Sequence, residues 1–230
     1  MEKIVILTGA GISAESGLGT FRDEGGLWAQ HRIEDVATPE GFVRDPQLVH
    51  DFYNARRAQA AEAKPNPAHE ALARLQREAK GEVVIVTQNV DGLHEAAGAT
   101  RVLHMHGALD GALCAACDHR WGAPLTMAPD DLCPACQKAT TRPDIVWFGE
   151  MPYYMDGIWQ HLEEADVFAA IGTSRQVYPA AAFGQHAGRA GAHTVELNLE
   201  PSANTRDFAE ARHGPASAVV PLWVEDVLSL

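Results

Sequence analysis

The chain has 230 residues, of which 46% are hydrophobic, so it is long enough for one large domain carrying a small module. Its 18 Lys and Arg residues against 31 Asp and Glu residues give a formal net charge of −13, which argues against a polyanion such as duplex DNA as the main partner. No apolar run approaches the roughly 18 residues of a membrane span, and the run at 4–7 is too short for a signal peptide. We therefore expect a cytoplasmic monomer with no membrane or nucleic-acid partner, whose four cysteines are reduced.

Short apolar runs alternate with helical patterns along the chain. Strands are predicted at residues 3–8, 82–87, 166–171 and 193–197, and helices at 46–63, 67–79, 156–165 and 179–190. The first three strands are nearly continuous in apolar residues, as parallel strands covered on both faces are. Strands that alternate with helices predict an α/β fold with a doubly wound parallel sheet.

Each predicted strand ends in a polar or glycine-rich cluster. These clusters lie at residues 9–13, 87–91, 172–174 and 198–200. In open parallel sheets the ligand crevice lies at the carboxyl ends of the strands, so the four clusters are predicted to line one crevice. The alternative for any single cluster is an ordinary turn, which α/β proteins need at these positions in any case.

The first cluster, Gly9-Ala10-Gly11-Ile12-Ser13-Ala14, fits the dinucleotide-binding pattern G-x-G-x-x-G/A directly after a strand. Glycines let the backbone approach a pyrophosphate, and a helix start would offer free N–H donors. The acidic residue expected roughly 20 positions later is missing, so the motif is not that of an ordinary dehydrogenase. The chain continues instead with Thr20-Phe21-Arg22-Asp23, where the arginine suits a phosphate and the phenylalanine a ring; a plain surface loop is the alternative.

The cysteines form the clearest local pattern, Cys114-x2-Cys117-x15-Cys133-x2-Cys136. This spacing is typical of a tetrahedral zinc site made of four thiolates. Because four protein ligands leave no position for water or substrate, the zinc is predicted to be structural.

Histidine is the side chain best suited to act as a base near neutral pH. The chain has eleven histidines, and composition alone selects none of them. His106, in His104-Met105-His106-Gly107, lies between the second strand cluster and the cysteines, and this position favours it over the others.

A set of motifs occurs in a fixed order over nearly the whole chain. They are GAGIS (9–13), TFRD (20–23), TQNVD (87–91), HMHG (104–107), the four cysteines, RPDIVWFGE (142–150), GTS (172–174) and NLE (198–200). Together they resemble the sirtuins, the NAD-dependent protein-lysine deacylases. The resemblance implies a Rossmann-like NAD-binding domain at 1–30, 65–107 and 143–230. A helical insertion at 31–64 and a zinc-ribbon insertion at 108–142 would form a small domain.

The resemblance also implies a reaction and its residues. The acyl oxygen of a modified lysine would attack the ribose carbon that carries nicotinamide, and His106 would act as general base on a ribose hydroxyl. The products would be free lysine, nicotinamide and O-acyl-ADP-ribose. A peptide-pairing segment would include Val146, Phe148 and Gly149. The implied contacts to NAD are Gly9, Ala10, Gly11, Ser13, Phe21, Arg22, Trp28, Gln88, Asn89, Asp91, Gly172, Thr173, Ser174, Asn198, Leu199, Glu200 and Ala216.

Tyr53 and Arg56 resemble the Tyr-x-x-Arg pair with which the class III sirtuins bind acidic acyl groups. At a spacing of three residues they share a helix face, and an arginine and a phenol can together bind a carboxylate. This pair predicts activity on succinyl- and malonyl-lysine in addition to acetyl-lysine. The alternative is an exposed helix face with an unrelated arginine.

Two other functions are kept as alternatives. One is an ADP-ribosyltransferase that cleaves NAD in the same way but transfers ADP-ribose to protein. The other is an inactive nucleotide-binding scaffold whose zinc ribbon serves as a binding module.

Overall fold

The computed structural model describes residues 2–19, 30–174, 177–202 and 205–229. Its larger sheet has six parallel strands in the order β3-β2-β1-β7-β8-β9. The bounds of these strands are β1 Lys3–Thr8, β2 Glu82–Thr87, β3 Val102–His104, β7 Val167–Ile171, β8 His193–Asn198 and β9 Glu210–His213. The predicted doubly wound parallel sheet is therefore confirmed, with two short edge strands, β3 and β9, that the sequence did not predict.

The strand order reverses at β1, because the chain adds β2 and β3 on one side of β1 and β7 to β9 on the other. Thr8, the last residue of β1, pairs with Thr87 at the end of β2 and with Ile171 at the end of β7. Three of the predicted clusters thus start side by side at the switch point, which is where open α/β sheets bind ligands.

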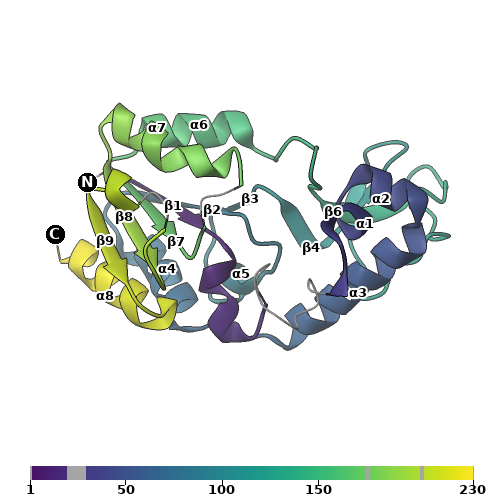
Figure 1. Ribbon diagram of the computed structural model, residues 1–230, viewed down its shortest axis with the longest axis horizontal. Helices are drawn as coiled ribbons and strands as arrows, with labels where there is room; N and C mark the ends of the chain where they lie inside the picture. The colour runs from purple at the N-terminus through teal and green to yellow at the C-terminus, as the bar shows by residue number, and fades with distance from the viewer. Residues whose placement is uncertain (1, 20–29, 175–176, 203–204, 230) are drawn as a thin grey trace.

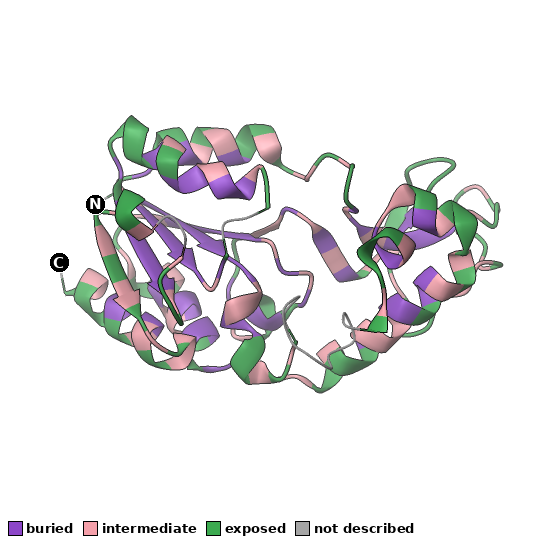
Figure 2. Cartoon of the chain, viewed as in Figure 1, coloured by how far each residue is buried: buried purple, intermediate pink, exposed green. Residues whose placement is uncertain are grey.

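Helices cover both faces of this sheet, as Figure 1 shows. Successive residues of β1 point to opposite faces: Ile4 and Ile6 pack with α4 (Pro67–Glu78) and α8 (Ala216–Leu228), and Val5 and Leu7 with α6 (Met155–Glu163) and α7 (Phe183–Ala190). Burial on both faces explains the continuous apolar runs of the central strands, which are buried throughout in Figure 2.

A second unit lies at the other end of the molecule (Figure 1). Its antiparallel sheet has the order β5-β4-β6, and it packs with helices α1 to α3 around a core that includes Phe52, Leu109 and Trp147. The bounds are α1 Ile33–Val36, α2 Pro39–Arg44, α3 Pro46–Glu62, β4 Gly107–Cys114, β5 Arg120–Gly122 and β6 Thr141–Ile145. The domain limits given above, at 31–64 and 108–142, stay a prediction.

The local chemistry explains where the predicted helices begin. Asp45 accepts a hydrogen bond from Leu48 N (3.0 Å) ahead of α3, and Asn66 accepts one from Ala68 N (2.9 Å) ahead of α4; a proline opens each helix.

The predicted helix at 179–190 begins instead with a 3₁₀ turn, Ala180–Ala182, before α7. The described residues also form the short helix α5 (Leu93–Ala96) and 3₁₀ turns at Ala10–Ile12, Ala14–Ser16 and Thr205–Asp207. No helix within the described ranges is long and apolar enough to cross a membrane.

Candidate functional site

The glycines of the first motif bring two turns together at the switch point. A Cβ atom added to Gly9 or to Gly11 would lie 2.8 Å from Gly172 O, and one added to Gly172 would lie 2.4 Å from Ile12 N. Gly11 N donates to Gly172 O (2.8 Å), so the turns after β1 and β7 pack backbone against backbone. These glycines are therefore required by turn packing. The predicted helix start is replaced by the 3₁₀ turns Ala10–Ile12 and Ala14–Ser16.

A buried polar cluster lies where β1 and β2 end. The side-chain amide of Asn89 donates to Gly9 O (3.1 Å) and to Ser13 Oγ (3.2 Å), and Ser13 Oγ donates to Asp91 Oδ2 (3.1 Å). Burial raises the pKa of Asp91, against hydrogen bonds from Leu93 N–H and the Ser13 hydroxyl that lower it. The cluster brings together three residues from two predicted clusters and offers a polar ligand both donors and acceptors.

Thr173 connects the second, seventh and eighth strands. Gln88 Nε2 donates to Thr173 Oγ1 (2.9 Å), and Asn198 Nδ2 donates to Thr173 O (3.0 Å). Hydrogen bonds therefore join the predicted clusters that follow β2, β7 and β8 into one continuous row.

His106 lies on the short connection between β3 and β4 and is half-buried. Its Nδ1 lies 3.1 Å from Gln88 O; because a carbonyl only accepts, Nδ1 carries the proton and Nε2 is left as the basic nitrogen. Burial lowers the pKa of His106 below its ordinary value, and the hydrogen bond to Gln88 O offsets this only in part. The ring is thus neutral near pH 7 and able to take up a proton at Nε2.

The remaining predicted NAD contacts vary in position. Ala10 is half-buried, Ser174, Leu199 and Glu200 are exposed, and Ala216 is the first residue of α8. Next to Ala216, Ser217 donates from its backbone N (2.9 Å) and its hydroxyl (2.6 Å) to the Glu15 carboxylate, which ties α8 to the turn after β1. Phe21, Arg22 and Trp28 lie outside the described residues.

The predicted acyl-binding pair lies on α3, in the smaller unit. Tyr53 is 1% exposed, and the guanidinium carbon of the half-buried Arg56 lies 5.8 Å from the centre of the Tyr53 ring. Burial lowers the pKa of Arg56, against the negative charge of Asp91, which raises it. Tyr53 and Arg56 thus pack against one another along α3.

The predicted peptide segment follows β6. Val146 N donates to His106 O (2.9 Å) and Phe148 N donates to Ala37 O (3.0 Å), so the segment is tied to the backbone of His106 and to the residue that follows α1. Phe148 is 45% exposed, and Gly149 is also exposed.

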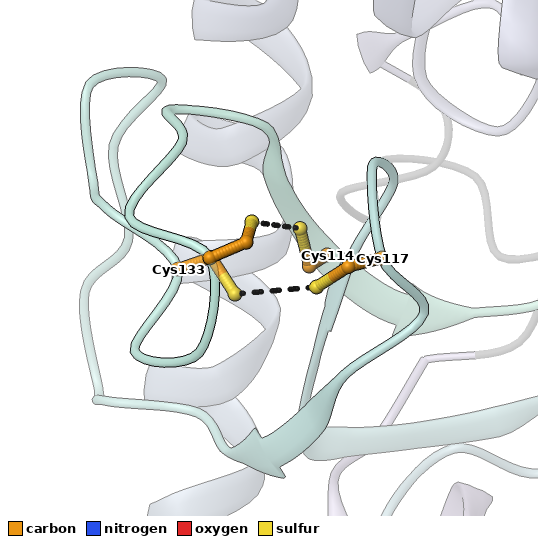
Figure 3. Close-up of side chains that lie close together, drawn as sticks. Cys114, Cys117 and Cys133 are labelled. Atoms are coloured by element: carbon orange, nitrogen blue, oxygen red, sulfur yellow. Dashed lines mark hydrogen bonds between the residues drawn. The ribbon is translucent and has the colours of Figure 1, made fainter.

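The four cysteines form a compact cluster in the smaller unit. Cys114 and Cys136 have sulfurs 3.6 Å apart and Cys117 and Cys133 3.8 Å apart, and all four sulfurs lie within 4.8 Å of one another. A zinc ion with Zn–S bonds of about 2.3 Å would require sulfurs about 3.8 Å apart. Figure 3 shows the labelled sulfurs of Cys114, Cys117 and Cys133 turned toward one another.

The backbone around the cysteines repeats one turn twice. Asp118 N donates to Cys114 O (3.0 Å) and Gln137 N donates to Cys133 O (2.9 Å), with φ values of 57° at Asp118 and 59° at Gln137. Two matching turns that each present two thiols fit a tetrahedral structural zinc, with no ligand position left over.

Three further histidines surround the polar cluster, and sequence reasoning did not select them. His69 Nε2 lies 3.4 Å from Ser13 Oγ, His94 Nε2 lies 3.0 Å from Thr8 Oγ1, and His104 Nε2 lies 2.9 Å from Glu95 Oε1. Burial lowers the pKa of His69 to about 4 and that of His94 to about 3. The only signal in the sequence was local to His69, which completes the capping box begun by Asn66.

Comparison with known proteins identifies the family. The model of the Sir2 family matches residues 9–179 of the chain. The chain belongs to the Sir2 family. The expected sirtuin resemblance is confirmed.

Relatives within the Sir2 family cover almost the whole chain. A Caulobacter vibrioides protein named NAD-dependent protein deacylase is 53% identical over 99% of this chain and 97% of its own length. A crystal structure of a Sir2 homologue–NAD complex has a TM-score of 0.91 and 37% identity, and it covers 99% of this chain and 90% of the other. A mutant Sir2 homologue in complex with 2'-O-acetyl ADP-ribose has a TM-score of 0.90 and 38% identity, with 99% and 94% of the two chains covered.

Proposed function

We propose that this Sir2-family chain is an NAD-dependent protein-lysine deacylase. The observation that carries the proposal is the placement of His106. Its ring is held at Nδ1 by Gln88 O and left basic at Nε2, and Gln88 directly precedes Asn89 of the polar cluster. The relative named NAD-dependent protein deacylase and the two complexes with NAD and with 2'-O-acetyl ADP-ribose support this chemistry.

The residues at the switch point suit NAD as the co-substrate. Asn89, Ser13 and Asp91 offer an amide, a hydroxyl and a carboxylate within one buried cluster, the mixture needed for a carboxamide and sugar hydroxyls. In the reaction NAD loses nicotinamide and its ribose carbon accepts the acyl oxygen of the modified lysine. His106 Nε2 then takes the proton of a ribose hydroxyl, and this hydroxyl attacks the acyl carbon, which is still bound to the lysine nitrogen. Water adds to the same carbon and the lysine amine leaves, so the products are free lysine and O-acyl-ADP-ribose.

The zinc ion supplies no step of this reaction. Bound by Cys114, Cys117, Cys133 and Cys136, it would cross-link the two turns of the ribbon and so stabilise the small unit that carries part of the cleft. The proposed partners are acylated protein lysines, bound along Val146, Phe148 and Gly149. We also propose a cytoplasmic monomer that binds no nucleic acid, in keeping with the net charge of −13.

The proposed acyl range includes succinyl and malonyl groups as well as acetyl. A carboxylate at the end of the acyl chain would bind the Arg56 guanidinium and the Tyr53 hydroxyl, which share one face of α3. Tyr53 is buried and Arg56 is half-buried, so less water competes with the acyl carboxylate here than on an open surface.

Product analysis tests the proposed activity against its alternatives. The chain is incubated with NAD and with acetyl-, succinyl- or malonyl-lysine peptide, and the products are identified by mass spectrometry. A deacylase yields nicotinamide and O-acyl-ADP-ribose; an ADP-ribosyltransferase instead attaches ADP-ribose to protein. An inactive scaffold releases no nicotinamide with any peptide.

The variant Arg56→Met tests the acyl range. It removes one charged partner of the acyl carboxylate, a bond of about 1.5–3 kcal/mol, so we expect desuccinylation to fall by roughly tenfold to a hundredfold while deacetylation changes little. The kcat/KM values for the two peptides measure this. Arg44→Met, which alters an exposed arginine on α2, is the matched control. Equal losses on both peptides would contradict a role in binding the acyl carboxylate.

A further inference from the structure

A buried hydrogen bond joins the acyl-binding helix to the peptide segment. Trp147 Nε1 donates to the Tyr53 hydroxyl at 3.1 Å, and the two residues are 2% and 1% exposed. They are 94 positions apart, on the segment after β6 and on α3. The bond therefore links two parts of the site that were predicted separately.

Trp147 is itself held in place by two further side chains. The Arg142 guanidinium carbon lies 3.5 Å from the centre of the Trp147 ring, and Phe42 packs on the indole at a centroid distance of 5.2 Å. Arg142 in turn forms two hydrogen bonds to the Glu150 carboxylate, of 2.7 Å and 2.9 Å, and Trp147 N donates to the same carboxylate at 2.8 Å. The ion pair of Arg142 and Glu150 thus holds the Trp147 ring and backbone so that the indole N–H points toward Tyr53.

The direction of this bond decides where the Tyr53 proton goes. An indole N–H only donates, so the Tyr53 oxygen must accept from it and the phenol proton must point elsewhere. Within the described part of the chain no group accepts that proton. Burial raises the pKa of Tyr53, so the phenol keeps its proton at neutral pH.

Accepting one hydrogen bond also makes a hydroxyl a better donor, because the two bonds polarise one another. Arg56 lies beside the same ring, so an acyl carboxylate bound there would receive a charged bond from Arg56 and a polarised one from Tyr53. An acetyl group has no carboxylate and gains nothing from this arrangement.

We propose that Trp147 is a positioning residue for acidic acyl groups, which turns the Tyr53 proton toward the acyl carboxylate and strengthens it as a donor. This role rests on the proposed function, in which Tyr53 and Arg56 bind that carboxylate. Trp147 lies between Val146 and Phe148 in the chain, but its indole is buried against Tyr53, so its side chain is expected to affect acyl selectivity and not peptide binding.

A double-mutant cycle tests the role of Trp147. Trp147→Phe keeps an aromatic ring but removes the N–H, so we expect the KM for succinyl-lysine peptide to rise about fivefold, with kcat and the acetyl-peptide KM within about twofold. Tyr53→Phe should raise the succinyl-peptide KM at least as much. In the Tyr53→Phe background, Trp147→Phe should add nothing, because the hydroxyl through which it acts is already gone.

The controls separate structure from positioning. Trp121→Phe, on β5 of the same unit, is the matched substitution and should leave the ratio of succinyl to acetyl activity unchanged. If Trp147→Phe does not fold, as judged by thermal unfolding, benzothienylalanine incorporated at position 147 replaces it; this isostere of tryptophan has sulfur in place of the N–H.

Three results would overturn the proposal in distinguishable ways. Additive effects in the double variant would show that Trp147 does not act through Tyr53. Equal losses on succinyl and acetyl peptides would leave Trp147 a purely structural role. If Tyr53→Phe and Arg56→Met both leave the succinyl-to-acetyl ratio unchanged, the proposed acyl range itself fails and the role of Trp147 fails with it.

Discussion

Two effects that oppose one another set the protonation of His106. Burial favours the neutral ring, whereas the carbonyl of Gln88 holds the proton on Nδ1 and favours the charged form; burial prevails. A general base must be unprotonated to work, and this environment favours an unprotonated Nε2 at neutral pH.

The pH dependence of deacylation follows from this pKa. The pKa of His106 lies below the ordinary 6.5, so kcat/KM should have reached its plateau near pH 7. It should fall as the pH decreases through a value below 6.5, because Nε2 then becomes protonated. We expect the plot of kcat/KM for acetyl-lysine peptide, from about pH 5 to about pH 8, to show that acid limb.

Substitution of His106 tests its proposed role as general base. His106→Ala should lower kcat/KM by at least about a hundredfold and remove the acid limb, with the zinc content unchanged. The exposed His193, on β8, serves as the control through His193→Ala. Wild-type turnover in the His106→Ala variant would rule out its role as base.

At the residue scale the sequence revealed what is encoded locally. The cysteine spacing and the HMHG motif are short patterns, and the resemblance they carry named His106 as the base and the cysteines as ligands. The Trp147–Tyr53 bond spans 94 positions and the Ser13–His69 contact 56, so neither leaves a pattern in the sequence. Such contacts become visible only when the packing of several elements is known.

At the scale of elements, the ribbon depends on its cross-link because its own core is small. Its loop docks on α3 through Met127, whose backbone N and O bond Asn54 (2.9 Å and 2.8 Å) and whose sulfur lies 3.1 Å from Arg57 Nη2. Arg57 is 5% exposed and also donates to Leu109 O (2.6 Å). The ribbon and α3, which carries the proposed acyl-binding pair, therefore pack as one unit.

Zinc removal should consequently affect the acyl site, although the metal takes no part in the chemistry. A chelator or Cys133→Ala should release the ion, unfold the ribbon and lower activity on all acyl peptides. Metal analysis together with hydrogen exchange of residues 108–142 measures both effects. Full activity in a zinc-free sample would contradict a structural role for the ion.

Helices that follow a capping residue and a proline were the easiest elements to predict. Asp45-Pro46 and Asn66-Pro67 mark the starts of α3 and α4. The C-terminal helix α8 was not predicted, because Pro221, a residue that usually ends helices, lies inside it. The edge strands β3 and β9 are only 3 and 4 residues long, too short to show a periodic pattern.

At the scale of the whole molecule, the parallel sheet was predictable but its strand order was not. Continuous apolar runs show that strands are covered on both faces, whereas the reversal at β1 depends on pairings between distant segments, such as Thr8 with Ile171. The convergence of the clusters on one crevice followed from a general rule for such sheets and not from any one residue.

Gly107, the first residue of β4, lies where the chain passes from the parallel sheet to the antiparallel one. Its φ is +79°, and an added Cβ would lie 2.0 Å from Asp144 O on β6. Gly107→Ala should therefore force β4 and β6 apart, destabilise the protein by about 1–3 kcal/mol and lower kcat/KM for every acyl peptide.

Thermal unfolding and peptide assays measure this prediction. Gly122→Ala is the matched control, because a Cβ at Gly122 meets nothing within 4 Å. Unchanged stability and turnover in Gly107→Ala would show that the crossing of β4 and β6 adapts without moving His106.

Between β3, which ends at His104, and β4, which begins at Gly107, the chain has only Met105 and His106. The backbone of this connection is fixed on both sides, because Met105 N donates to Thr87 O (3.0 Å) on the parallel sheet and Val146 N donates to His106 O (2.9 Å) after β6. A tether of two residues with both ends anchored leaves the imidazole little slack. Its position is therefore set jointly by the two sheets, so a change that shifts either sheet would be felt at the proton acceptor.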